Sequence, residues 1–255
     1  MINIIGMGAI NLFLLLKHYM KFCFTTIMYM MVPRVYINNI YMIFVDTFMY
    51  SLLLIALTST FTGMVLVIEL YSGFSQYANE QYIGTIISLS MVRELIPVLI
   101  ALVVNARVTS AFSAEIASMK VTEQIPALTI LGINPIQYIV IPRIIGILLA
   151  MPLLILIGDT LSFLGAYIIA NFKLGLNGDL LLTNMWDVLA SKDIALGVIK
   201  GLLFALSIGF NGCYFGYYAT PAAKGVGLAT TNSVVCVAVS IFAIDYLVAL
   251  FLLGS

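Results

Sequence analysis

Several long stretches of this sequence contain no charged residue. Three of them are Thr47–Ile68, Gly201–Ala223 and Val226–Ile244. Each is close to the length of about 20 residues that an α-helix needs to cross a hydrocarbon core of about 30 Å. A helix pairs its backbone groups within one segment, as lipid requires, whereas a β-barrel would show short segments of alternating polarity. The stretches therefore predict membrane-spanning helices.

The composition disfavours most other classes of protein. Of the 255 residues, 63% are hydrophobic and 9% are charged, and the mean hydropathy is +1.14. A soluble domain of this size cannot hide so much apolar surface. The 11 basic and 11 acidic residues cancel, so no basic field exists to attract nucleic acid. The sequence therefore predicts an all-α polytopic membrane protein rather than a soluble enzyme, a disordered chain or a nucleic-acid binder.

The N-terminal segment, residues 1–35, is apolar but interrupted by charge. Lys17, His18 and Lys21 lie inside it, and Pro33 ends it. A spanning helix would carry both lysines near its middle, at about 2.5–3.5 kcal/mol for each. A helix lying in the membrane interface keeps its cations among the head groups. We expect an interfacial helix here, with a spanning helix as the alternative.

Five spanning helices are expected in the remainder of the chain. They cover about residues 46–70, 83–114, 136–170, 194–218 and 230–253, and a polar link over 171–193 joins the third to the fourth. No linker divides them, so residues 1–255 are expected to form one domain with a five-span core over 46–253. With a cytoplasmic N-terminus the inner loops hold seven cations, and the outer links hold only Lys173 and Lys192. The positive-inside rule therefore places the N-terminus inside and the C-terminus outside.

Ionisable residues interrupt two of the expected spans. Arg93 and Glu94 are adjacent in the second span, and Lys200 is expected at a similar outer depth in the fourth. Charges at membrane depth usually face a cavity or a partner. Three charges at one level would form a polar collar at the mouth of a cavity, although a self-neutralising pair at the interface is the simpler reading.

Small residues recur in two rows along the second span and its extension. Ala106, Ser110 and Ala114 form one row, and Ser113 and Ala117 form the other. Small residues at this spacing let helices approach closely in lipid. The sequence leaves open whether these contacts lie within or between subunits.

A charged and turn-marked stretch, residues 115–135, follows the second span. Thr122 is a plausible helix start, and Gly132 and Pro135 close the segment. We expect a short cytoplasmic helix over about residues 119–132. It is either part of a solvated loop or a docking helix for a cytoplasmic partner.

The residues for catalysis and for nucleotide or metal binding are missing from the sequence. It contains no GxxxxGK[ST] motif and only one histidine, His18. Cys23, Cys213 and Cys236 form no CxxC pair and are expected to be small buried hydrophobic residues. The chain is therefore predicted to be no enzyme and to need no metal or cofactor. If it works against a gradient, the energy comes from another subunit or from an ion.

Two segments of the chain carry a family resemblance. They are Arg93–Leu99, which reads RELIPVL, and Ala114–Ile125, which reads AEIASMKVTEQI. The run Gly132–Pro135 and the pair Pro142-Arg143 continue the match at the expected spacing. The chain resembles the MlaE-type permeases of ABC transporters, which work with MCE-domain substrate-binding proteins.

The resemblance implies a lipid transporter. The resemblance implies an interfacial helix and five spans in each subunit. It also implies a homodimer that binds two cytoplasmic ATPase subunits, with an MCE-domain protein on the outer side. The cargo of such permeases is phospholipid or a related lipid, moved between the inner membrane and the outer envelope. The membrane would be a bacterial inner membrane or a plastid inner envelope.

The resemblance also implies roles for individual residues. Lipid-cavity residues would be Arg93, Glu94, Lys200 and Tyr77, with a head-group phosphate meeting Arg93 or Lys200 and acyl chains contacting spans one, two and five. Residues coupling the permease to its ATPase would be Glu115, Lys120, Thr122, Glu123, Gln124, Ile125 and Leu128.

Two further classes of protein remain open at this point. One is an ion-coupled secondary transporter or channel, with Arg93, Glu94, Asp159 and Asp245 as relays within the membrane. The other is a structural membrane subunit, in which these charges would tolerate substitution. The presence of an ATPase partner would distinguish an ABC transporter permease from both of these classes.

Overall fold

The computed structural model describes residues 2–31, 36–74 and 80–252. All elements in these residues are helical, and η1, η2 and η3 are π-helical turns of five residues each. In chain order they are α1 (Ile2–Met30), α2 (Ile37–Phe74), α3 (Glu80–Ser90), η1 (Met91–Leu95), α4 (Ile96–Val104), η2 (Asn105–Thr109), α5 (Ser110–Val121), α6 (Gln124–Ile130), η3 (Ile136–Val140), α7 (Ile141–Phe172), α8 (Gly178–Val188), α9 (Ser191–Tyr217) and α10 (Ala223–Leu252).

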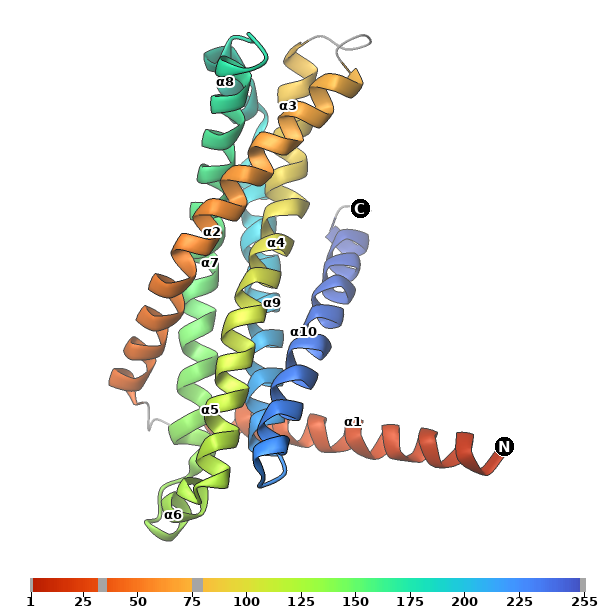
Figure 1. The fold of residues 1–255 in the computed structure, drawn as a ribbon, viewed down its shortest axis with the longest axis vertical. Helices are drawn as coiled ribbons and strands as arrows, with labels where there is room; N and C mark the ends of the chain where they lie inside the picture. Colours follow the sequence, from red (N-terminus) through yellow and green to blue (C-terminus); the bar gives the residue numbers. More distant parts are fainter. Residues whose placement is uncertain (1, 32–35, 75–79, 253–255) are drawn as a thin grey trace.

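The helices form an elongated bundle with one helix lying across its end (Figure 1). The long helices run side by side along the bundle, and α1 extends crosswise at the end where α6 also lies. The short helix α8 lies at the opposite end. We refer to these as the α6 end and the α8 end.

Five helical segments of the described chain are long and apolar enough to cross a membrane. They are Ile37–Gly73, Gly84–Val121, Ile136–Phe172, Ser191–Tyr217 and Ala223–Phe251. The prediction of an all-α protein with five spans is therefore confirmed. The first and second spans are longer than predicted, because α2 begins at Ile37 and the second segment continues to Val121.

The extension of the second span corrects the predicted boundary of the short helix. Glu115 and Lys120 lie on α5, within the spanning segment, and not on a separate helix. Thr122 stands at the C-terminal end of α5 and does not start the next helix. Glu123 adopts a left-handed backbone with φ of 58°, which turns the chain, so α6 runs only from Gln124 to Ile130.

Helix α1 lies across the end of the bundle, in the orientation that the predicted interfacial helix requires. It is absent from the candidate spans, and it packs crosswise against η3, α7 and α9 (Figure 1). Phe22 is buried and contacts the rings of Tyr214, Tyr217 and Tyr218 at the end of α9. Nδ1 of His18 lies 3.2 Å from the hydroxyl of Tyr214. Aromatic packing and this hydrogen bond therefore fix α1 to the bundle.

Close packing of α2 on α7 depends on glycine. A Cβ at Gly63 would overlap the backbone carbonyl of Ser162, and a Cβ at Gly165 would overlap that of Thr60. The two backbones approach each other because neither glycine carries a side chain, as is common between helices in lipid. This pair of helices forms the most extensive contact in the bundle.

The two rows of small residues have different surroundings. Ser113 and Ala117 are fully buried, and Gly216 of α9 packs against the backbone of Ser113. Ala106 is exposed, and Ser110 is only partly buried. The row of Ser113 and Ala117 therefore packs within the subunit, whereas the other row leaves a narrow small-residue surface on the outside of the bundle.

Replacement of Gly63 by alanine should disrupt the packing of α2 on α7. Overpacking costs about 1–3 kcal/mol, and each kcal/mol lowers the unfolding midpoint of a chain of this size by about 2–4 °C. We expect a fall of several degrees in the thermal unfolding of the purified chain. Gly73→Ala, in the same helix, is the matched control because nothing lies within 4 Å of its added Cβ. Equal midpoints for the two variants would contradict the close approach.

Candidate functional site

Three charged side chains from three elements meet inside the bundle, and we call them the charge cluster. They are Glu94 of η1, Lys200 of α9 and Asp245 of α10. Nζ of Lys200 lies 2.5 Å from Oε2 of Glu94 and 2.7 Å from Oδ1 of Asp245. The Lys200 side chain is 0% exposed. A buried ammonium is costly unless carboxylates compensate it, so these ion pairs tie the three elements together.

The charge cluster has one more acid than base. Oε1 of Glu94 is buried without a hydrogen-bond partner, and Oδ1 of Asp245 is ion-paired without accepting an aligned hydrogen bond. Two carboxylate oxygens of the cluster therefore accept no hydrogen bond. Carboxylate oxygens left in this state at membrane depth are typical of a functional site.

Arg93 points to a different partner from its neighbour Glu94. Its Nε and Nη2 lie 2.8 Å and 2.7 Å from Oδ1 of Asp193. The second oxygen of Asp193 accepts a hydrogen bond from the backbone N–H of Ala190 at 3.0 Å, which closes the first turn of α9. A carboxylate is favourable at a helix N-terminus. Asp193 therefore both stabilises the first turn of α9 and anchors Arg93.

The sequence identified only part of this arrangement. Glu94 and Lys200 come together, as two of the three charges of the predicted collar, whereas Arg93, the chain neighbour of Glu94, pairs elsewhere. Asp193 was not predicted, and Asp245 was considered only as an ion relay. The sequence could have indicated a role for Asp245 in the cluster, because Asp245 is the only acidic residue of the last span. Tyr77 lies outside the residues that the structure describes.

These pairings bear on how a phosphate could bind. Both cations already have carboxylate partners, so an anion at either one must compete with Asp193, Glu94 or Asp245. Arg93 is 33% exposed, whereas Lys200 has no exposed surface. Arg93 is therefore the one of the two that an incoming anion can reach without rearrangement of the bundle.

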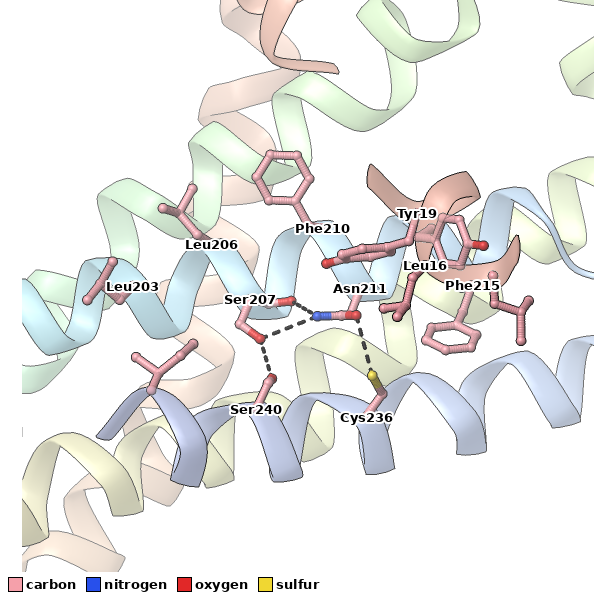
Figure 2. A pocket seen from close by; sticks show the side chains of 13 residues that line it. Leu16, Tyr19, Leu203, Leu206, Ser207, Phe210, Asn211, Phe215, Cys236 and Ser240 are labelled. Carbon is pink, nitrogen blue, oxygen red and sulfur yellow. Dashed lines mark hydrogen bonds between the residues drawn. The ribbon is translucent and has the colours of Figure 1, made fainter. Parts of the chain in front are cut away.

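A large apolar groove lies between α1, α9 and α10, and we call it the α9–α10 groove (Figure 2). Its volume is about 690 Å³, within the range of about 300–1,000 Å³ that small-molecule sites occupy. Its lining residues are Leu15, Leu16, Tyr19, Leu203, Leu206, Ser207, Phe210, Asn211, Tyr214, Phe215, Cys236, Ser240 and Ile244. Of the spans expected to contact acyl chains, only the fifth lines this groove.

The few polar side chains of the groove bond to one another (Figure 2). The hydroxyls of Ser207 and Ser240 are 2.5 Å apart, and the amide of Asn211 donates to the Ser207 carbonyl at 2.8 Å. The Cys236 thiol donates to the Asn211 carbonyl oxygen at 3.6 Å. Burial raises the pKa of the Tyr19 phenol, so this side chain stays uncharged. The groove therefore presents an apolar, uncharged surface suited to a hydrocarbon chain.

The short helix α6 presents apolar residues to solvent at the α6 end. Ile130 and Leu131 are 87% and 73% exposed, whereas Ile125 is 8% exposed and faces the bundle. Leu128 is partly buried and lines a cleft of about 260 Å³ with Gln124. Among the predicted coupling residues, Ile125 thus anchors α6 on the bundle, whereas the exposed Ile130 and Leu131 were not among the predicted residues.

The two charged residues of α5 are held by neighbouring helices. Oε2 of Glu115 lies 2.7 Å from Nη2 of Arg143 in α7. The ammonium of Lys120 donates to the backbone carbonyl of Tyr217 at 2.9 Å and lies 5.9 Å from the centre of the Tyr218 ring. Both residues therefore fasten the end of the second span to its neighbours.

Comparison with known proteins places the chain among transport proteins. The family described as Permease MlaE matches residues 36–251. A probable ABC transporter permease of Rickettsia typhi is 38% identical over 246 residues, which cover 96% of this chain and 95% of that protein. A probable ABC transporter permease of Synechocystis is 38% identical over 192 residues, with 75% and 73% covered.

A plant protein is also similar. The chloroplastic protein trigalactosyldiacylglycerol 1 of Arabidopsis thaliana is 35% identical over 195 residues, which cover 76% of this chain and 56% of that protein. The family match spans all five candidate membrane helices of the structure. This chain therefore belongs to the MlaE family of ABC transporter permeases.

Proposed function

We propose that this permease moves a membrane lipid, with energy from a separate ATPase subunit. The observation that carries the proposal is the α9–α10 groove, whose two longer walls are membrane spans and whose lining is almost entirely apolar. A hydrocarbon chain is the ligand that such a surface favours in a bilayer. The name of the Arabidopsis relative, which contains that of a galactolipid, is in keeping with a lipid cargo.

The charge cluster and the Arg93–Asp193 pair are proposed to guard the lipid path near the α8 end. A head-group phosphate would approach Arg93 first and exchange with Asp193, because charge-assisted pairs of this kind are similar in strength. Opening the path further would separate Glu94 from Lys200 and so loosen η1 from α9. Tyr77, outside the described residues, remains a proposed lipid contact.

ATPase coupling is proposed to occur at the α6 end, which would be cytoplasmic. The exposed side chains of Thr122, Glu123 and Gln124 and the apolar pair Ile130 and Leu131 form one small surface around α6. Exposed apolar residues beside polar ones are typical of a protein interface. Ile125 and Leu128 would hold α6 on the bundle while the partner binds.

Three further parts of the assembly follow from the same proposal. Two copies of the chain would associate, using exposed apolar residues of α10 such as Val239 and Phe242 and the small-residue row at Ala106 and Ser110. An MCE-domain protein would meet the α8 end. The membrane would be a bacterial inner membrane or a plastid inner envelope.

An ion-coupled mechanism is the second candidate, and one residue favours it. Oδ1 of Asp159 is buried in α7 and has no hydrogen-bond partner. The other three proposed relays, Arg93, Glu94 and Asp245, are occupied in ion pairs. Membership of an ABC transporter family favours the ATP-driven reading over this one.

Removal of the Lys200 charge should destabilise the protein. Lys200→Met leaves Glu94 and Asp245 without their cation, and loss of one partner of a buried pair costs about 3–5 kcal/mol. We expect a lower thermal unfolding midpoint and no lipid transfer by the complex between vesicles. The triple variant Glu94→Gln, Lys200→Met, Asp245→Asn should recover stability, because no charge remains in the cluster, and should still fail in transfer. Wild-type transfer by the triple variant would refute a role for the cluster in lipid movement.

Charge placed on α6 should weaken ATPase binding without unfolding the permease. Ile130→Glu changes an 87% exposed side chain, and a charge in a buried interface core costs several kcal/mol, which corresponds to at least about a tenfold loss of affinity. Co-purification and titration of the ATPase measure this loss. Ile125→Ala should instead lower the unfolding midpoint.

Leu180→Glu is the matched control for this experiment, because α8 is also short but lies at the opposite end of the bundle. It should bind the ATPase as the wild type does. Equal ATPase affinity for Ile130→Glu and Leu180→Glu would contradict docking on α6.

A further inference from the structure

A second, smaller pocket lies between α2 and the second span, toward the α6 end. Its volume is about 200 Å³. Unlike the α9–α10 groove it has charged residues in its lining: Asp46 of α2, Arg107 of η2 and Glu115 of α5. Thr47 and Tyr50 of α2 and Phe112 of α5 also line it. We call it the α2–α5 pocket. It is too small for a whole lipid and of a size for a head group.

Arg107 lacks a carboxylate partner in the described part of the chain. Its Nη1 donates to the hydroxyl of Ser51 at 3.0 Å, and its guanidinium carbon lies 5.0 Å from the centre of the Tyr50 ring. An arginine within a membrane span is expensive, and it normally pairs with an acid or faces a cavity. Most of its five N–H donors remain available to the pocket.

Asp46, which lines the same pocket, is an acid without a partner. Among the described residues no hydrogen bond or ion pair engages its carboxylate, and it does not pair with Arg107. Glu115 gives one oxygen to Arg143 and is 57% exposed. The charged groups that line the pocket are therefore Asp46, Glu115 and Arg107. Because Glu115 is already paired with Arg143 outside the lining, Asp46 and Arg107 remain for a ligand, with one charge of each sign. Such a balance favours a zwitterion over an anion.

The depth of these groups along α2 matches the edge of the bilayer. The helix has 38 residues. At the rise of an α-helix it is roughly twice as long as the hydrocarbon core is thick, so it extends beyond the core. Asp46 lies between two and three turns after the first residue of the helix, Ile37. If α2 extends equally beyond both faces of the core, Asp46 stands at its boundary.

The two charges also have the order of a lipid head group. Tyr50 and Ser51, which contact Arg107, lie just over one turn deeper along α2 than Asp46. In a phosphoethanolamine head group the phosphate is the deeper group and the amine points to water. A lipid drawn into the pocket from the leaflet at the α6 end would thus present ammonium to Asp46 at the boundary of the core. Its phosphate would meet Arg107 about one turn below that boundary, with its chains beyond it along the exposed Leu53.

We propose that the α2–α5 pocket binds the phosphate and primary amine of a zwitterionic lipid head group in the leaflet at the α6 end. This deepens the proposed function, on which it rests, because it names the class of lipid that meets the permease at that leaflet. The same chemistry could come from soluble phosphoethanolamine, and the experiment separates the two sources.

The experiment measures lipid binding to the purified permease–ATPase complex by native mass spectrometry. The complex is titrated with phosphatidylethanolamine and, separately, with phosphatidylglycerol, which lacks the amine. We expect phosphatidylethanolamine to bind at least about tenfold more tightly, as loss of one charged hydrogen-bonded pair predicts. Asp46→Asn should lose this preference and retain phosphatidylglycerol, whereas Arg107→Gln should weaken both lipids.

Two control variants guard against misfolding and general charge effects. Arg107→Lys keeps the cation and should keep most of the binding and the wild-type unfolding midpoint. Lys17→Gln removes an exposed cation of α1 and should change neither affinity. Equal affinities for the two lipids in the wild type, or an unchanged preference in Asp46→Asn, would overturn the proposal. Displacement of the lipid by an equal concentration of soluble phosphoethanolamine would overturn the assignment to a lipid.

Lipid transfer between vesicles, measured on the same complex, separates this inference from the proposed function. Transfer of phosphatidylglycerol and phosphatidylethanolamine at equal rates, without preferential binding, would refute the pocket alone. Preferential binding without transfer of any lipid would refute the proposed function and leave the pocket as a binding site.

Discussion

The buried ammonium of Lys200 is the constraint on which the rest of the bundle depends. A charge with no exposed surface is stable only while carboxylates contact it, and the two that do come from η1 and α10. The last helix, α10, packs on α9 and α5 but leaves much of its surface exposed. The ion pair to Asp245 therefore fixes α10 at a depth where few other buried residues hold it.

The π-helical turns explain how charged side chains reach these positions. Arg93 and Glu94 lie in η1, and Arg107 lies in η2. A π-helical turn inserts an extra residue into a helix and shifts the direction of the side chains around it, and such turns are frequent at functional sites. In η1 the two adjacent charges can thus face different partners, Asp193 and Lys200. In η2 the buried Asn105 donates to the carbonyl of Val234, which joins the second span to α10.

Hydropathy predicted the five spans because lipid imposes the same demand on every segment that crosses it. The ends of the spans were less predictable, since they depend on tertiary partners. Glu115 and Lys120 look like the end of a span in the sequence, yet Arg143 and the Tyr217 carbonyl compensate them and the helix continues. The partners of Lys200 come from distant positions on either side of it in the chain, and no local pattern links such positions. The short helix α8, which begins at the Asn177 cap, was expected only as a polar link.

One nearly continuous helical segment joins the two proposed lipid contacts to the proposed ATPase contact. From Gly84 to Val121 it carries Glu94 near one end, Arg107 in the middle and Glu115 near the other, and α6 follows after a short turn. A packed helix resists bending and transmits displacement along its axis. Because Arg107 lies nearer to α6 along the segment than Glu94 does, a shift of α6 would reach the α2–α5 pocket before the charge cluster. The π-helical turns at η1 and η2 are the points where such a shift can be absorbed or redirected. Coupling between ATP hydrolysis and lipid movement would then need no element beyond this segment and the helices that its charges hold.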